Sequence, residues 1–161
     1  MGTGKSVVGK LLASELNRPF LDLDEKIEKE AGRTIAQIFA EEGEAAFRRL
    51  ESEAVKEVSQ LTEYVIATGG GVMLDEGNVQ RLKSCGSLVC LTSRPEIILK
   101  RASQSLASRP LLDGPHPQGR IEELLTLRAP FYAKADVTMD TSERSVQEVV
   151  EEIVRWIREK L

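Results

Sequence analysis

The residues with the clearest chemical signal stand at the start of the chain, where positions 2–6 read Gly-Thr-Gly-Lys-Ser. They match the second half of the phosphate-binding pattern G-x-x-x-x-G-K-[ST]. In that pattern the glycines let phosphate oxygens reach backbone N–H groups, Lys5 reaches the β- and γ-phosphates, and the Ser6 hydroxyl holds Mg²⁺. A helix is predicted directly after the loop, so its positive N-terminal end would face the anion. The segment predicts a site for phosphates and Mg²⁺.

Two interpretations of this segment remain open when it is read alone. The pattern also needs an earlier glycine and usually follows a strand, and neither is present in the sequence. The match is therefore either a coincidence in a short stretch, or the mark of a phosphate-loop protein whose first strand and first glycine are expected upstream of Gly2. Residues elsewhere in the chain decide between the two.

Two further groups of residues follow short apolar runs. Asp22 and Asp24 end the run 20–24, and two positions apart on a strand they would face the same way. One could order Mg²⁺-bound water while the other accepts a hydrogen bond from a substrate hydroxyl; alternatively, both are solvated and cap the next helix. The triple glycine at 69–71 ends the run 64–68. It either lets a ligand approach the backbone or forms a plain flexible turn.

Arginines in three places could bind an anionic group. Arg48 and Arg49 stand on a helix predicted over 44–61, Arg109 flanks a proline-rich loop, and Arg128 precedes Ala-Pro-Phe-Tyr. A guanidinium can hold a carboxylate or a phosphate through two hydrogen bonds. Each arginine taken alone could equally be surface charge, so its weight depends on the pattern that it completes.

The order of the predicted elements brings these residues together. Strands at 20–24, 64–68, 87–91 and 137–139 alternate with helices, which is typical of an α/β fold with a mainly parallel sheet. Open sheets of this kind bind ligands beyond the carboxyl ends of their strands. The carboxylates, the triple glycine and the phosphate loop all fall at such ends, and this convergence favours a true phosphate loop. The long loop at 107–119 has the length of a functional segment.

Composition argues against several classes of protein. With 161 residues, 41% hydrophobic and 30% charged, the chain is typical of one soluble domain, and its net charge of −4 lacks the basic footprint of a nucleic-acid binder. No apolar run approaches the roughly 20 residues of a membrane span, and no signal peptide opens the sequence. Cys85 and Cys90 form no zinc pattern and indicate reduced thiols in the cytoplasm. His116 is expected in a solvated loop.

Taken in order, these motifs resemble those of the shikimate kinases from Gly2 to the end of the chain. The phosphate loop is shared by many kinases, whereas the other motifs in this order are much more specific. The resemblance rests on these stretches: Gly-Thr-Gly-Lys-Ser (2–6), Phe-Leu-Asp-Leu-Asp-Glu-Lys-Ile-Glu (20–28), Ile-Phe-Ala-Glu-Glu-Gly-Glu-Ala-Ala-Phe-Arg-Arg-Leu-Glu (38–51), Thr-Gly-Gly-Gly (68–71), Ser-Arg-Pro-Leu-Leu (108–112) and Leu-Arg-Ala-Pro-Phe-Tyr-Ala-Lys-Ala-Asp (127–136).

The resemblance implies a fold and a domain plan. The fold is a three-layer α/β/α phosphate-loop fold like that of the nucleoside monophosphate kinases, with a mainly parallel five-stranded sheet whose first strand is missing from this chain. Residues 1–161 would form a single kinase domain, with a substrate-binding region at about 24–52 and a lid at about 105–119. The protein is expected to act as a monomer in the cytoplasm.

The resemblance also implies the reaction and the residues that bind the acceptor. The family transfers the γ-phosphoryl of ATP to the 3-hydroxyl of shikimate, in the route to chorismate and the aromatic amino acids. Asp24 would bind that hydroxyl and serve as its base, while Glu51 would orient Arg48 on the shikimate carboxylate. Phe39 and Phe47 would wall the pocket. The residues expected to bind shikimate are Asp24, Arg48, Gly69, Gly70, Gly71 and Arg128.

On the nucleotide side, the resemblance implies ATP and Mg²⁺. Ser6 and Asp22 would serve Mg²⁺, Asp22 through water, and Lys5 and Arg109 would supply positive charge to the transferred phosphoryl group. Arg101 and Arg144 would lie near the adenine. The residues expected to bind ATP are Gly2, Thr3, Gly4, Lys5, Ser6, Val7, Arg101, Arg109 and Arg144. One departure from some members of the family is Val146, where they carry a proline against the adenine.

Two alternative functions remain open at this stage. A gluconate-type kinase shares the phosphate loop and the architecture, and its carboxylate-bearing substrate would also suit the arginines. The other alternative is an inactive nucleotide-binding relative of the kinases. Phe-Arg-Arg-Leu-Glu and the pair Asp22 and Asp24 favour shikimate, and the presence of every catalytic side chain named above argues against an inactive relative.

Overall fold

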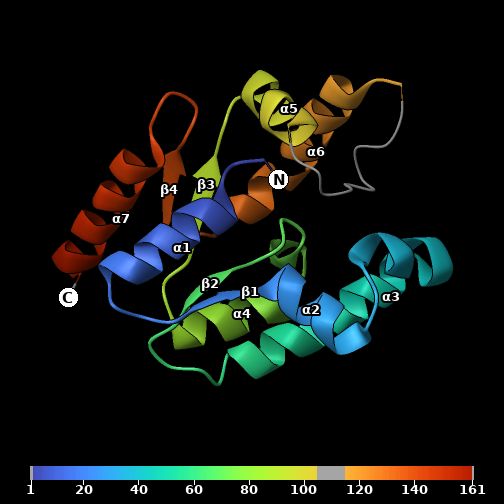
Figure 1. Ribbon diagram of the computed structural model, residues 1–161, viewed down its shortest axis with the longest axis horizontal. Helices are drawn as coiled ribbons and strands as arrows, with labels where there is room; N and C mark the ends of the chain where they lie inside the picture. The colour runs from blue at the N-terminus through green and yellow to red at the C-terminus, as the bar shows by residue number, and fades with distance from the viewer. Residues whose placement is uncertain (1, 105–114, 161) are drawn as a thin grey trace.

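The computed structural model describes residues 2–104 and 115–160, and these residues form alternating strands and helices (Figure 1). The α/β class predicted from the sequence is confirmed. In chain order the elements are α1 (Lys5–Glu15), β1 (Phe20–Asp22), α2 (Leu23–Ala31), α3 (Ile35–Val58), β2 (Val65–Ala67), the 3₁₀ helix η1 (Val72–Leu74), α4 (Glu76–Cys85), β3 (Val89–Thr92), α5 (Pro95–Ser103), α6 (Pro117–Tyr132), β4 (Val137–Asp140) and α7 (Val146–Lys160).

The strands lie between two layers of helices (Figure 1). Helices α1 and α7 cover one face, where α7 buries the apolar stripe that its sequence shows at helical spacing, including Val149, Val150 and Ile153. Helices α2, α3 and α4 cover the other face, around Leu23, Ile38 and other apolar side chains. Each layer has its own core cluster, so the strand ends are held from both sides.

All the strand pairs are parallel, as predicted, but the described residues form two separate pairs. Strand β1 pairs with β2 so that Asp22 lies opposite Ala67, and β3 pairs with β4 so that Thr92 lies opposite Asp140. Between β2 and β3 lies a mostly apolar cavity of about 450 Å³. The described residues contain four strands, and the five-stranded count stays a prediction.

Local sequence signals account for several of the helix boundaries. A capping box begins α3, where the Thr34 hydroxyl accepts from the Gln37 N–H and the Gln37 side chain accepts from the Thr34 N–H. Gly43, with φ of 83°, interrupts the helical backbone of α3 in the left-handed region that glycine adopts readily. In the described ranges, no helix combines the length and the apolar character needed to cross a membrane.

One prediction about the first strand is wrong. Asp22 and Asp24 were expected on one strand with parallel side chains, but β1 ends at Asp22 and α2 begins at Leu23. The Asp22 side chain accepts hydrogen bonds from the N–H groups of Asp24 and Glu25 and so caps α2. Asp24 therefore extends from the first turn of a helix.

Candidate active site

The phosphate-loop residues adopt the backbone that an anion site requires. Gly2 and Gly4 have φ of 63° and 92°, in the left-handed region that favours glycine. Gly4 directly precedes α1, whose first turn contains no acidic side chain and no side-chain cap. The partial positive charge of the N-terminal end of α1 is therefore available to a phosphate group at this loop.

The two residues expected at Mg²⁺ lie side by side. Ser6 Oγ donates a 2.6 Å hydrogen bond to Asp22 Oδ2 at the carboxyl end of β1. The described residues contain no cluster of three or more His, Cys, Asp or Glu side chains that could hold a metal. Mg²⁺ in nucleotide sites uses one or two protein oxygens and fills its other positions with phosphates and water. The pair of Ser6 and Asp22 fits that requirement.

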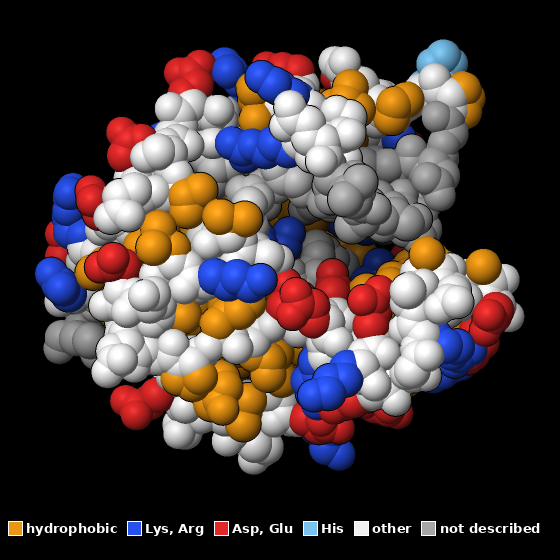
Figure 2. All heavy atoms as spheres, in the orientation of Figure 1, with side chains coloured by type: hydrophobic (Ala, Val, Ile, Leu, Met, Phe, Trp, Pro, Cys, Tyr) orange, Lys and Arg blue, Asp and Glu red, His pale blue; other side chains and the backbone are white. Residues whose placement is uncertain are grey.

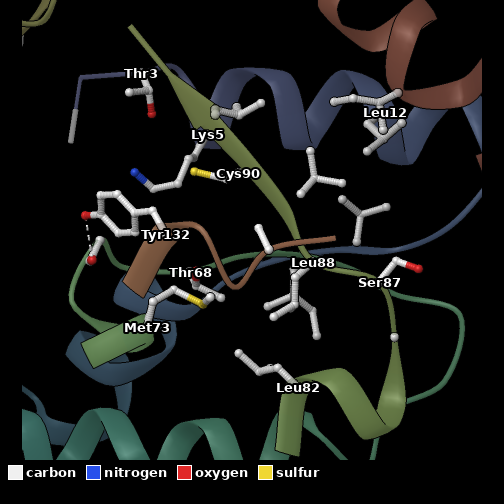
Figure 3. A pocket seen from close by; sticks show the side chains of 18 of the residues that line it. Thr3, Lys5, Leu12, Thr68, Met73, Leu82, Ser87, Leu88, Cys90 and Tyr132 are labelled. Atoms are coloured by element: carbon white, nitrogen blue, oxygen red, sulfur yellow. Dashed lines mark hydrogen bonds between the residues drawn. The ribbon is translucent and has the colours of Figure 1, made fainter. Parts of the chain in front are cut away.

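Lys5 extends from the phosphate loop into the cavity between β2 and β3. Figure 3 shows its side chain near Cys90 of β3 and Tyr132 of α6. Burial raises the pKa of the Cys90 thiol, and the nearby Lys5 charge opposes this shift. The Lys5 charge also opposes the raised pKa of Asp24.

Asp24 and Glu51 direct carboxylate oxygens toward Gly69. A Cβ on Gly69 would lie 2.9 Å from Glu51 Oε1 and 3.1 Å from Asp24 Oδ1. Both oxygens are buried and accept no hydrogen bond from any described residue. Burial raises the pKa of Asp24, and the Asp22 charge raises it further; burial likewise raises the pKa of Glu51, against the Arg48 charge. Two buried acceptors without donors indicate a place for a ligand that supplies hydroxyl groups.

Arg48 is held in place from three sides. Its guanidinium donates 2.8 Å and 3.0 Å hydrogen bonds to Glu51 and Glu44, and it lies 5.1 Å from the centre of the Phe47 ring. It also covers Gly71, because a Cβ there would fall only 2.1 Å from Nη1 of Arg48. Arg49, the next residue on the same helix, is exposed. The geometry therefore selects Arg48 as the arginine of this site.

Arg128 brings a buried positive charge to the site, and this charge opposes the raised pKa of Glu51. Its residue is only 7% exposed, and it lines the cavity beside Gly69, Gly70 and Tyr132. Within 2–104 and 115–160, no hydrogen bond or ion pair engages its guanidinium. Burying a charge without a partner costs free energy. An anionic ligand bound here would pair with the guanidinium and offset that cost.

The other residues predicted for the site fall in three different settings. Arg101 donates to Thr141 and, at 3.5 Å, to the carbonyl of Gly2, so in this structure it braces the phosphate loop. Arg144 pairs with Glu152 beside the start of α7. Val7 is 59% exposed on α1. Arg109 lies outside the described residues.

Figure 2 shows that the surface is hollowed between the part that carries α5 and α6 and the part that carries α2 and α3, where charged side chains of both signs gather. Phe39 and Phe47 belong to the same region, with ring centroids 5.1 Å apart. The site thus combines a cationic end at Lys5 and α1, carboxylates near Gly69, and two arginines. It can hold two anionic groups with a hydroxyl-bearing region between them.

The sequence reasoning missed two residues. Tyr132 donates a 2.8 Å hydrogen bond from its hydroxyl to the carbonyl of Gly70, and Thr141 joins Arg101 to the phosphate loop by donating to the Thr3 carbonyl. Tyr132 could have been found, because it follows Arg128 by four positions and such residues share a helix face. Nothing in the sequence around Thr141 indicates its contact with Thr3.

Comparison with known proteins identifies the family. A family model described as shikimate kinase matches residues 1–158. The chain belongs to the shikimate kinase family. A similar shikimate kinase, from Symbiobacterium thermophilum, is 48% identical over 162 residues that cover 99% of this chain and 93% of that protein. Another, from Caldanaerobacter subterraneus subsp. tengcongensis, is 47% identical over 155 residues, covering 96% and 90%.

Solved shikimate kinases share the fold. The shikimate kinase from Acinetobacter baumannii in complex with shikimate superimposes with a TM-score of 0.94 at 36% identity, over 99% of this chain and 89% of that one. The shikimate kinase from Aquifex aeolicus gives a TM-score of 0.82 at 38% identity, over 99% and 92%. The phosphate-loop kinase fold expected from the motifs is therefore confirmed.

Proposed function

We propose that this chain transfers the γ-phosphoryl group of ATP to the 3-hydroxyl of shikimate, with Mg²⁺ as its metal. In this reaction the hydroxyl oxygen forms a bond to the γ-phosphorus, the bond from that phosphorus to the β,γ-bridging oxygen breaks, and ADP leaves. Membership of the shikimate kinase family supports the reaction. The observation that carries it to this site is the buried Arg128, which has no hydrogen-bond or ion-pair partner in the described chain and whose charge acts on the buried, unsatisfied carboxyl of Glu51.

The arginines and Asp24 bind different groups of the acceptor, shikimate. Arg48 and Arg128 hold the shikimate carboxylate, because a guanidinium matches the two oxygens of a carboxylate. Asp24 accepts the 3-hydroxyl and takes its proton as the bond to phosphorus forms. Burial supports this role because it raises the pKa of Asp24 and so makes the carboxylate a stronger base.

The other end of the site handles the nucleotide. Residues 2–7 and the N-terminal end of α1 receive the phosphates, and Lys5 supplies positive charge to the transferred group, which suits a reaction that depends mainly on positioning and electrostatics. Ser6 and Asp22 hold Mg²⁺, which supplies further charge neutralisation when it is bound. Arg101 and Arg144 lie on the adenine side, and Arg109 is assigned to the lid at about 105–119, mostly outside the described residues.

The same proposal covers the organisation of the protein. Residues 1–161 act as one kinase domain, and the region at about 24–52 binds shikimate through α2 and α3. The protein works as a monomer in the cytoplasm. The gluconate-type alternative is less well supported, since the matching family model is that of shikimate kinase.

The direct test is a coupled assay of ADP release with MgATP. We expect release that depends on shikimate, with gluconate giving no more than the rate without an acceptor. Equal release with gluconate would favour the gluconate-type alternative. Binding of ATP with no release in the presence of shikimate would favour an inactive nucleotide-binding relative and would contradict the proposal.

Replacement of Gly71 by alanine should selectively weaken shikimate binding. The backbone of Gly71, with φ of −91° and ψ of −10°, accepts alanine without strain, but its Cβ would occupy the place of the Arg48 guanidinium. Displacing that charged contact costs about 1.5–3 kcal/mol. We therefore expect shikimate affinity to fall about tenfold or more, with ATP affinity nearly unchanged.

Calorimetric titration with each ligand provides the measurement. Gly86→Ala is the matched control, because Gly86 has an extended backbone and open space where a Cβ would be. The control should bind both ligands as the unaltered chain does. Normal shikimate affinity in Gly71→Ala would show that Arg48 does not need its position over Gly71.

A further inference from the structure

The hydroxyl of Tyr132 holds the middle carbonyl of the triple-glycine turn. Tyr132 is the last residue of α6, and its hydroxyl donates a 2.8 Å hydrogen bond to the carbonyl oxygen of Gly70, 62 positions earlier in the chain (Figure 3). The side chain is half-buried and lines the cavity beside Lys5. This contact links α6 to the turn that follows β2.

The other two carbonyls of the turn are engaged locally. Gly69 accepts from the N–H of Val72 at 3.3 Å, and Gly71 accepts from the N–H of Leu74 at 3.0 Å, as η1 begins. In the described chain, Tyr132 provides the hydrogen bond to the Gly70 carbonyl. The orientation of the peptide between Gly70 and Gly71 therefore depends on a side chain from a distant element.

That orientation determines what the turn presents to a ligand. A trans peptide is planar, so its C=O and N–H point in opposite directions. When Tyr132 holds the Gly70 carbonyl, the N–H of Gly71 points the other way. Among the residues that the structure describes, the N–H groups of Gly70 and Gly71 meet no protein acceptor. The turn therefore has two backbone donors without an acceptor in the described chain, and Arg48 lies directly over one of these glycines, Gly71.

We infer that Tyr132 is a positioning residue for the shikimate site. Its hydroxyl sets the Gly70–Gly71 peptide, and through it the backbone donors and the surface of Gly71 that Arg48 covers. Arg128 lies one turn earlier on the same helix, so α6 aligns an arginine and the glycine turn with one ligand. The inference rests on the proposed function, because it assumes that shikimate binds at this turn.

Tyr132→Phe tests the inference because it removes the hydroxyl and keeps the ring. We expect KM for shikimate to rise about three- to tenfold, the scale of one neutral hydrogen bond. KM for ATP should stay within twofold, because the phosphate loop and its brace at Thr141 are untouched. A role limited to stability would lower the melting temperature without this selective change in KM.

The chain provides a matched control, since it contains two tyrosines. Tyr64 is 39% exposed, and in the described residues its hydroxyl makes no hydrogen bond. Tyr64→Phe should therefore leave both KM values unchanged. Selective loss of shikimate affinity in Tyr132→Phe alone supports the inference. An unchanged shikimate KM in Tyr132→Phe, or an equal rise in both variants, overturns it.

A double-mutant cycle with Arg128→Ala distinguishes an effect of Tyr132 on the glycine turn from an effect of Tyr132 on Arg128. If Tyr132 acts on the glycine turn, its replacement should weaken shikimate binding by a similar factor with or without Arg128. If Tyr132 instead positions Arg128, its replacement should have no further effect once Arg128 is absent, and the inference is then wrong. Shikimate binding by the unaltered chain is measured first. If the unaltered chain does not bind shikimate, both the proposed function and the inference are wrong. If the unaltered chain binds shikimate and Tyr132→Phe binds it equally well, only the inference is wrong.

Discussion

Replacing Asp24 by asparagine should lower kcat with shikimate by about 100-fold or more, the usual scale for loss of a general base. Asparagine keeps the shape of the side chain but takes no proton from the 3-hydroxyl. Asp24 is suited to this role because one of its oxygens is buried and accepts no hydrogen bond from the described residues, and because burial raises its pKa. Steady-state kinetics at saturating ATP and shikimate gives the measurement.

The melting temperature of Asp24→Asn should distinguish loss of the catalytic base from loss of the folded structure. A carboxyl whose pKa is raised on folding makes the folded state less stable at pH values above that pKa, because its charge is disfavoured there. Neutral asparagine removes this buried charge, so the melting temperature near neutral pH should be unchanged or higher. Asp75→Asn is the control, since asparagine also caps a helix well and Asp75 caps α4 and is not assigned to the site. A near-normal kcat in Asp24→Asn would refute the assignment of Asp24 as the base.

Replacing Arg128 by alanine should weaken shikimate binding about tenfold or more. A charged hydrogen bond contributes roughly 1.5–3 kcal/mol, and Arg128 has no protein partner in the described chain that would compete for its guanidinium. Arg128 gives a cleaner test than Arg48, because removal of Arg48 would leave the buried Glu51 without its ion pair. ATP binding should change little, since Arg128 is assigned to the acceptor shikimate and not to the nucleotide.

The control for this variant is another arginine of α6. Arg120 pairs with Glu123 at the surface, and surface pairs contribute little to stability. Arg120→Ala should therefore bind shikimate as the unaltered chain does. Calorimetry that finds unchanged shikimate affinity in Arg128→Ala would remove Arg128 from the proposed carboxylate clamp.

Local patterns in the sequence were sufficient to predict the fold class and the phosphate loop. Alternation of apolar strands with helices predicts an α/β protein, and the observed elements alternate in this way. The phosphate loop is also local, because its glycines, lysine and serine act within one turn and the helix that follows. Such features depend on residues that are neighbours in the sequence, so they can be predicted from the sequence alone.

The strand expected to include Asp24 was wrong, whereas the alternative that this segment caps the next helix is confirmed for Asp22. An apolar run that ends in alternating carboxylates fits a strand, but the Asp22 side chain accepts the N–H groups of Asp24 and Glu25 and starts a helix two residues earlier. Capping and strand extension compete at such a position, and the sequence signals for the two are similar. The tertiary contact of Asp22 with Ser6 then sets the direction of this carboxylate.

Other features of the site were decided only by tertiary structure. Arg48 and Arg49 are equivalent as residue types, yet only Arg48 lies over Gly71, because successive helical residues point in different directions and α3 packs with one face toward the turn. Arg128 is distinctive because folding buries it in the lining of the cavity with no hydrogen-bond or ion-pair partner among the described residues, and no local sequence pattern predicts this. The hydrogen bond from Tyr132 to Gly70 spans 62 positions and exists only because α6 packs against η1. The sequence by itself determined the class of fold and the anion-binding loop, through interactions between near neighbours. The packing of distant elements determined which arginine faces the ligand, which carboxylates are left unsatisfied and what holds the glycine turn.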